Sequence, residues 1–109
     1  MSSESYDFNQ IMETRREAVA SNIRPISAPE LKALGEKLFP YLDDSWRGVY
    51  FSFLEENPGG TFFYASTQDD IHVVYNRDKN KGLWFIPGAG KGPLQERGLK
   101  ILKEIVDHL

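Results

Sequence analysis

The chain has 109 residues, and its 13 Lys and Arg side chains against 16 Asp and Glu side chains give a formal net charge of −3. This length fits one domain, so we expect residues 1–109 to fold as a unit, with residues 1–5 disordered. A hydrophobic fraction of 40% excludes the composition of a disordered protein, and the absence of cysteine excludes a disulfide scaffold, a thiolate zinc site and a cysteine nucleophile.

The sequence shows no membrane-spanning run and no secretory signal at its N-terminus. The sequence holds no apolar run of about 18 residues, the length that a membrane span requires. Residues 1–5 lack both the basic start and the apolar run of a secretory signal. We therefore expect a soluble cytoplasmic protein.

Two helices are predicted in the first 45 residues. Asp7 and Gln10 can form a capping box, and the absence of Gly and Pro predicts a helix over residues 6–21 with a thin apolar stripe. A second capping box, Ser27 with Glu30, begins a helix that we expect to end at Pro40 and the pair Asp43-Asp44.

The hydrophobic period then changes. Residues 49–54, 62–67 and 71–76 each divide into two alternating sets of side chains, such as Val49, Phe51 and Phe53 against Tyr50, Ser52 and Leu54. A short apolar run follows at 83–86. This pattern predicts four strands. The connecting segments are short and rich in turn formers, so the strands are expected to form an antiparallel meander.

The last 18 residues read as a helix. Gly92-Pro93 would open it, and its apolar face would cover one side of the sheet. The predicted fold class is α+β, with two N-terminal helices, a four-stranded antiparallel meander and a C-terminal helix packed on the sheet.

A glycine-rich segment lies between the last strand and this helix. Gly88, Gly90 and Gly92, with Lys91, would present backbone N–H groups at a helix start, and Arg97 would follow in its first turn. Such an arrangement binds phosphate or carboxylate groups. The spacing matches neither the P-loop nor the dinucleotide fingerprint, and the alternative interpretation is a sharp turn that only glycine permits.

Histidines and paired acids are the other candidates for chemistry. His72 is expected to face solvent from a strand, and His108 lies beside the C-terminus; neither has metal-ligand spacing, so no metal and no cofactor is predicted. The pairs Asp43-Asp44, Glu55-Glu56 and Asp69-Asp70 fall at element ends and are interpreted as solvated turn residues, so no catalytic residue is assigned.

Aromatic side chains are more numerous than one sheet face requires. Ten of them lie in or beside the predicted strands, and alternation distributes them over both faces. If a single helix layer covers one face, the other face is an exposed apolar patch, which commonly marks a binding surface. The candidate contact residues are Trp46, Tyr50, Phe63 and Trp84. The alternative is that the N-terminal helices or a second subunit cover this face.

The leading hypothesis is a non-enzymatic protein-binding module, of the kind found among immunity-type inhibitors and dedicated chaperones. Residues 1–75 carry 6 basic and 12 acidic side chains, which favours a basic partner. A homodimer remains open, whereas the net negative charge disfavours nucleic acid. The alternative function is binding of a small anionic ligand, a phosphate or nucleotide, by residues 88–92.

Overall fold

The computed structural model describes residues 12–38, 40, 44–56, 60–67, 71–87 and 90–109, the side chains of Ser45, Trp46 and Val49 excepted. The helices are α2 (Arg16–Asn22), α3 (Ala28–Leu38), α4 (Asp44–Glu55) and α5 (Glu96–Asp107). The strands are β1 (Arg24–Ile26), β2 (Phe62–Ser66), β3 (His72–Asn76), β4 (Lys81–Ile86) and β5 (Gly90–Pro93).

One antiparallel sheet holds the five strands in the order β1-β2-β3-β4-β5. Strands that follow one another in the chain are therefore neighbours in space, and the α+β class and the antiparallel meander are confirmed. The expected number of four strands is wrong for this sheet, because β1 and β5 were not predicted and one predicted strand is helical.

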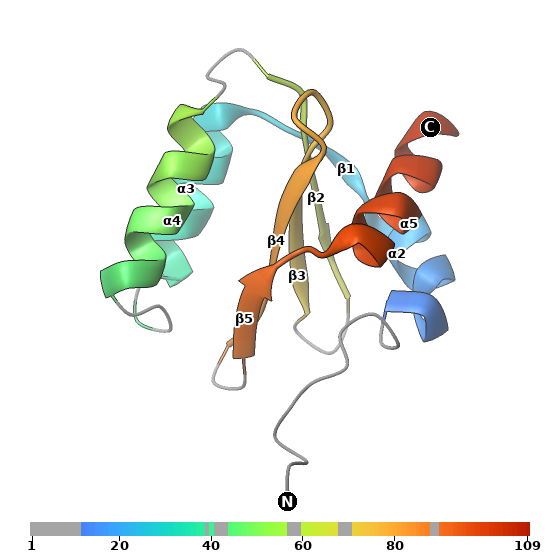
Figure 1. Cartoon of the computed structure of the whole chain (residues 1–109), viewed down its shortest axis with the longest axis horizontal. Helices are drawn as coiled ribbons and strands as arrows, with labels where there is room; N and C mark the ends of the chain where they lie inside the picture. Colours follow the sequence, from blue (N-terminus) through green and yellow to red (C-terminus); the bar gives the residue numbers. More distant parts are fainter. Residues whose placement is uncertain (1–11, 39, 41–43, 57–59, 68–70, 88–89) are drawn as a thin grey trace, which may run out of the picture.

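Helices cover both faces of the sheet (Figure 1). The pair α3 and α4 packs on one face, around a cluster of buried side chains that includes Leu31, Tyr50 and Phe62. The opposite face packs on α2 and α5 around a second cluster that includes Val19, Tyr75 and Leu102. The molecule therefore has two hydrophobic cores separated by the sheet.

Residues 49–54 form part of α4, so the strand predicted there is wrong. Nearly every residue of this stretch is apolar or aromatic, so a period of two and a period of 3.6 fit it equally well. The buried side chains are Tyr50, Phe53 and Leu54, which have the spacing of one helix face. Asp44, expected to end the preceding helix, lies in the first turn of α4, where an acid is favourable for the helix dipole.

The second predicted helix starts where its capping box placed it. The Glu30 backbone N–H donates to Ser27 Oγ at 3.3 Å, and the Ser27 backbone N–H donates to Glu30 Oε1 at 3.3 Å. Hydrogen bonds from the backbone and hydroxyl of Ser27 hold the pKa of the Glu30 carboxyl below its ordinary value. In the first predicted helix, residues 12–14 and 16–22 are helical with a turn at Arg15, and the Asp7–Gln10 box and residues 1–5 lie outside the described residues.

Gly90–Pro93 continue the sheet as β5, so the helix start predicted at Gly92-Pro93 is wrong. Gly92 pairs with Trp84, and a side chain at Gly92 would meet the indole of Trp84, with its Cβ 2.9 Å from Nε1. The Leu94 N–H donates to the Gly82 carbonyl at 2.8 Å, which prolongs the ladder by one position. The C-terminal helix α5 starts after this, at Glu96.

Both edge strands contain a proline. Pro25 lies in β1 and Pro93 in β5. Proline has no N–H to offer to an additional strand, so it is tolerated at an edge and makes that edge a poor template for further pairing.

Candidate functional site

The aromatic residues proposed as contacts do not form an exposed patch. The side chains of Tyr50 and Phe63 are 0% and 6% exposed, and Trp84 is half-buried. The expectation of an uncovered aromatic face is therefore wrong, because a helix layer lies on each side of the sheet. Trp46 belongs to α4, but its side chain lies outside the described residues.

Tyr50 joins the two helices of its layer. Its hydroxyl donates to the Leu31 carbonyl at 2.8 Å in a buried environment. Burial raises the pKa of this hydroxyl far above its ordinary value, and the neighbouring Tyr64 raises it further. Tyr50 is thus a structural residue of the α3–α4 core.

The residues proposed for anion binding lie on different faces of the sheet. Lys91 pairs with Phe85, whose side chain belongs to the cluster beneath α3 and α4, and directly opposite residues share a face. Arg97 lies on α5, across the sheet, in an ion pair with Glu13. Gly90 and Gly92 are in β5 and Gly88 is outside the described residues, so the expected set of amides at a helix start is not formed.

His72 is half-buried and does not face solvent as predicted. The Tyr64 hydroxyl lies 2.7 Å from His72 Nδ1, and the imidazole stacks on Phe85 with ring centroids 4.9 Å apart. Val74 and Asn76, which lie on the same face of β3 as His72, are buried, because α3 and α4 cover this face. His108 is exposed and its Nδ1 lies 2.7 Å from the Glu104 carbonyl.

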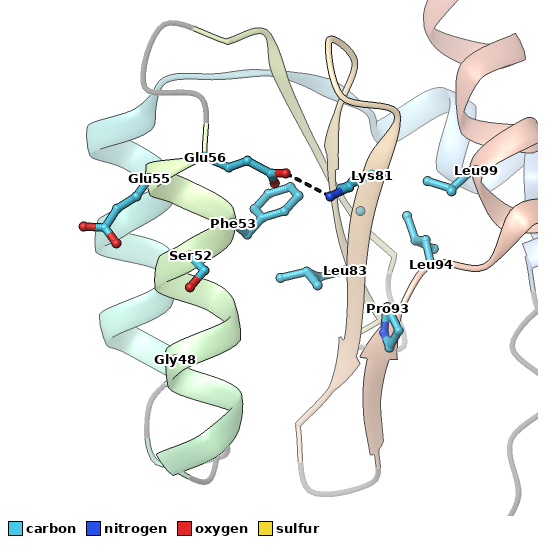
Figure 2. A pocket seen from close by; sticks show the side chains of 11 residues that line it. Gly48, Ser52, Phe53, Glu55, Glu56, Lys81, Leu83, Pro93, Leu94 and Leu99 are labelled. Carbon is cyan, nitrogen blue, oxygen red and sulfur yellow. Dashed lines mark hydrogen bonds and ion pairs between the residues drawn. The ribbon is translucent and has the colours of Figure 1, made fainter.

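Between α4 and the outer part of the sheet lies a cleft of about 1040 Å³, which we call the α4–β4 cleft (Figure 2). Helix α4 lines one side, and β4 and the end of β5 line the other. Leu94 and Leu99, which pack with the cluster beneath α2 and α5, line the cleft from beyond β4. The lining residues are Gly48, Ser52, Phe53, Glu55, Glu56, Lys81, Gly82, Leu83, Pro93, Leu94 and Leu99.

The walls of the cleft are mainly apolar. Phe53 and Leu83 face each other between helix and strand, and Pro93 continues the sheet wall onto β5 (Figure 2). On the helix wall, Gly48 and Ser52 are one turn apart and carry little side chain. Among the residues that the structure describes outside this helix, none lies within 4 Å of a Cβ position at Gly48. The small residues Gly48 and Ser52 leave space between this part of α4 and the strands β4 and β5.

Charge is concentrated at one end of the cleft. The Lys81 ammonium donates to Glu56 Oε1 at 2.9 Å, which ties the end of α4 to the start of β4. Glu55 precedes Glu56, and its carboxylate is directed away from Lys81 (Figure 2). Glu55 and Glu56 were predicted to be solvated residues that do not converge. Both are exposed at the end of α4 and their carboxylates point apart, and both residues also line the cleft.

A second, more polar hollow of about 460 Å³ lies across the sheet from the cleft. Ion pairs between Arg16 and Glu104 and between Arg97 and Glu13 span it. Four of its five charged lining side chains are paired with one another, so it offers less to a ligand than the α4–β4 cleft does.

Sequence reasoning missed the α4–β4 cleft. Its helix wall lies in the stretch that was interpreted as a strand, and its sheet wall includes a strand that was not predicted. One signal was present in the sequence, the small residues Gly48 and Ser52 at helical spacing beside bulky aromatics, but it has meaning only once residues 44–55 are known to be helical.

Comparison with known proteins gives no match to a family model, to a curated protein sequence or to a solved structure. Within the part of the chain that the structure describes, no helix has the length and apolarity to cross a membrane. Over the same residues, no group of three or more His, Cys, Asp or Glu side chains is placed to hold a metal ion.

Proposed function

We propose that this chain is a non-enzymatic protein-binding module that holds a segment of a partner protein in the α4–β4 cleft. The observation that carries the proposal is the cleft itself: about 1040 Å³ of open space with apolar walls and a carboxylate at one end. Sites that bind other molecules are typically concave and apolar with a few polar groups that fix orientation.

The chemistry of the lining favours binding over catalysis. The polar side chains among the lining residues are Ser52, Glu55, Glu56 and Lys81, and Glu56 and Lys81 neutralise each other. Among the described residues that line the cleft there is no histidine that could act as a base for Ser52. An inhibitor that masks a basic toxin and a chaperone dedicated to one client are both modules of this type.

The experiment is a capture comparison from the extract of the source cells, with three forms of the tagged protein. Gly48→Phe fills the cleft from the helix wall, where the structure has open space, so α4 should still form. Ala33→Phe adds the same side chain to the exposed side of α3 and is the matched control.

We expect the wild-type protein and Ala33→Phe to retain the same stoichiometric partner and Gly48→Phe to lose it. A partner that Gly48→Phe retains would place the binding surface elsewhere. A folded wild-type protein that retains no partner from the extract would contradict the proposed function.

A further inference from the structure

Two carboxylates lie at the C-terminal end of α4, where negative charge is unfavourable for a helix. The last turn of α4 contains no basic residue. Glu55 is its last residue and Glu56 follows, so both carboxylates lie at the C-terminal end, toward which the helix carbonyls point. Carboxylates at a helix C-terminus oppose the helix dipole, so this arrangement lowers stability. Lys81 neutralises one of the two carboxylates and leaves this end of the α4–β4 cleft with a net negative charge.

Glu56 can accept a second cation. A carboxylate has about four acceptor positions, and Lys81 occupies one of them through Oε1. The Glu56 side chain is 30% exposed, so its carboxylate is accessible from the cleft end. A lysine or arginine of an occupant would therefore meet a carboxylate that is already oriented by its bond to Lys81.

The shape of the cleft selects the conformation of the occupant. From Gly48 to Glu56 the helix wall advances about 12 Å, slightly more than two helical turns. Side chains form most of the walls, and the adjoining edge strand ends in Pro93, which has no N–H to donate to an added strand. An extended segment would leave its backbone without partners here, whereas a helix satisfies its own backbone.

We infer that the occupant of the α4–β4 cleft is an amphipathic helix of the partner protein, with apolar residues against Phe53, Leu83 and Pro93 and a lysine or arginine at Glu56. This inference rests on the proposed function, because it assigns the chemistry of the segment that the cleft would hold. Helices commonly dock in apolar grooves through residues on one face, with charged residues at the rim.

The test uses two synthetic helical peptides of about four turns. They share one leucine stripe and differ in carrying lysines or glutamates at one end. Fluorescence anisotropy should show tighter binding of the lysine peptide to the wild-type protein, and Gly48→Phe should abolish this binding. Backbone amide shifts on peptide addition should map to α4 and β4.

Two opposite charge variants make the test specific. Glu56→Gln should weaken binding of the lysine peptide by about fivefold, whereas Lys81→Gln removes the competing cation and should strengthen it by a similar factor. The exposed ion pair between these residues contributes little to stability, so both variants should fold. Glu17→Gln, on α2 across the sheet, is the control and should change nothing.

Each other outcome would overturn the inference. Equal affinity for the two peptides, or no change in Glu56→Gln and Lys81→Gln, would contradict the inference that a lysine or arginine of the occupant binds at Glu56. Equal binding of a proline-substituted peptide that cannot form a helix would contradict the inference that the occupant is helical. Self-association of the protein that Gly48→Phe abolishes would identify a second copy as the occupant. In all these cases the capture comparison still decides the proposed function separately.

Discussion

The ring of Tyr50 occupies the space in which a side chain at Gly35 would lie. A Cβ atom at Gly35 would overlap the ring carbons of Tyr50, while the Tyr50 hydroxyl reaches Leu31, one turn earlier on α3. Gly35 and Leu31 therefore form the contact surface on which α4 packs against α3, and the position of α4 determines the helix wall of the α4–β4 cleft.

Two glycine-to-alanine substitutions should change stability in opposite directions. Gly35→Ala forces a methyl group into the Tyr50 ring and should lower the free energy of unfolding by about 1 to 3 kcal/mol. Gly48→Ala adds a methyl group in open space on a helix and should raise it by up to about 1 kcal/mol. Urea denaturation measures both, and equal effects of the two substitutions would contradict the packing described for Gly35.

Tyr50→Phe should remove the buried hydrogen bond to Leu31 and lower the free energy of unfolding by about 1 kcal/mol. The substitution should also change the alkaline stability profile. Because burial raises the pKa of Tyr50 in the folded state, its contribution is complete below the unfolded pKa of about 10 and is lost as pH rises above it.

The alkaline loss should therefore be smaller in Tyr50→Phe than in the wild-type protein, measured by urea denaturation between about pH 9 and 11. Burial also raises the pKa of Tyr75, so part of the loss should remain. An unchanged alkaline profile would contradict the structural environment of Tyr50.

The capping box at the start of α3 should contribute to stability in a way that depends on pH in the acid range. Ser27→Ala should lower the free energy of unfolding by about 1 kcal/mol. The pKa of Glu30 is lowered in the folded state, so its contribution is present above the unfolded pKa of about 4.3 and is lost as pH falls through the folded value. Glu30→Gln should lack this acid-dependent loss, as measured by thermal unfolding from pH 6 to about pH 3.

Glu55→Gln should raise stability, by about 0.5 kcal/mol at low salt, because it removes a carboxylate from the C-terminal end of α4. Glu96→Gln is the matched control at the opposite kind of helix end, in the first turn of α5, where loss of the carboxylate should lower stability. Thermal unfolding should show shifts of opposite sign, and both should shrink as salt is added. Shifts of the same sign would argue against the dipole as their cause.

The sequence predicted those elements whose local pattern has one interpretation. Residues 62–66 and 72–76 are rich in aromatic or β-branched side chains and are flanked by turn formers, and both are strands. Ser27 and Glu30 carry a spacing that favours a helix start and little else, and α3 begins there. In these segments the local preference and the tertiary environment agree.

The other elements depend on contacts that are distant in sequence. Residues 49–54 fit either period, and only the burial of Tyr50 against α3 and the sheet makes them helical. β1 and β5 are short and contain proline or glycine, and they are strands because β2 and β4 offer free edges to them. The α4–β4 cleft requires all of these packing contacts together, so no local pattern could predict it.

The sequential order of the strands has a consequence for how the molecule folds and opens. β2 to β5 lie within residues 62–93 and pair only with chain neighbours, so they can associate through short loop closures. β1 is separated from β2 in the chain by α3 and α4, so their pairing closes a much longer loop. The ladder between them is short, and we expect it to form last. Native-state hydrogen exchange should therefore release the amides of β1 before those of β3, at the centre of the sheet.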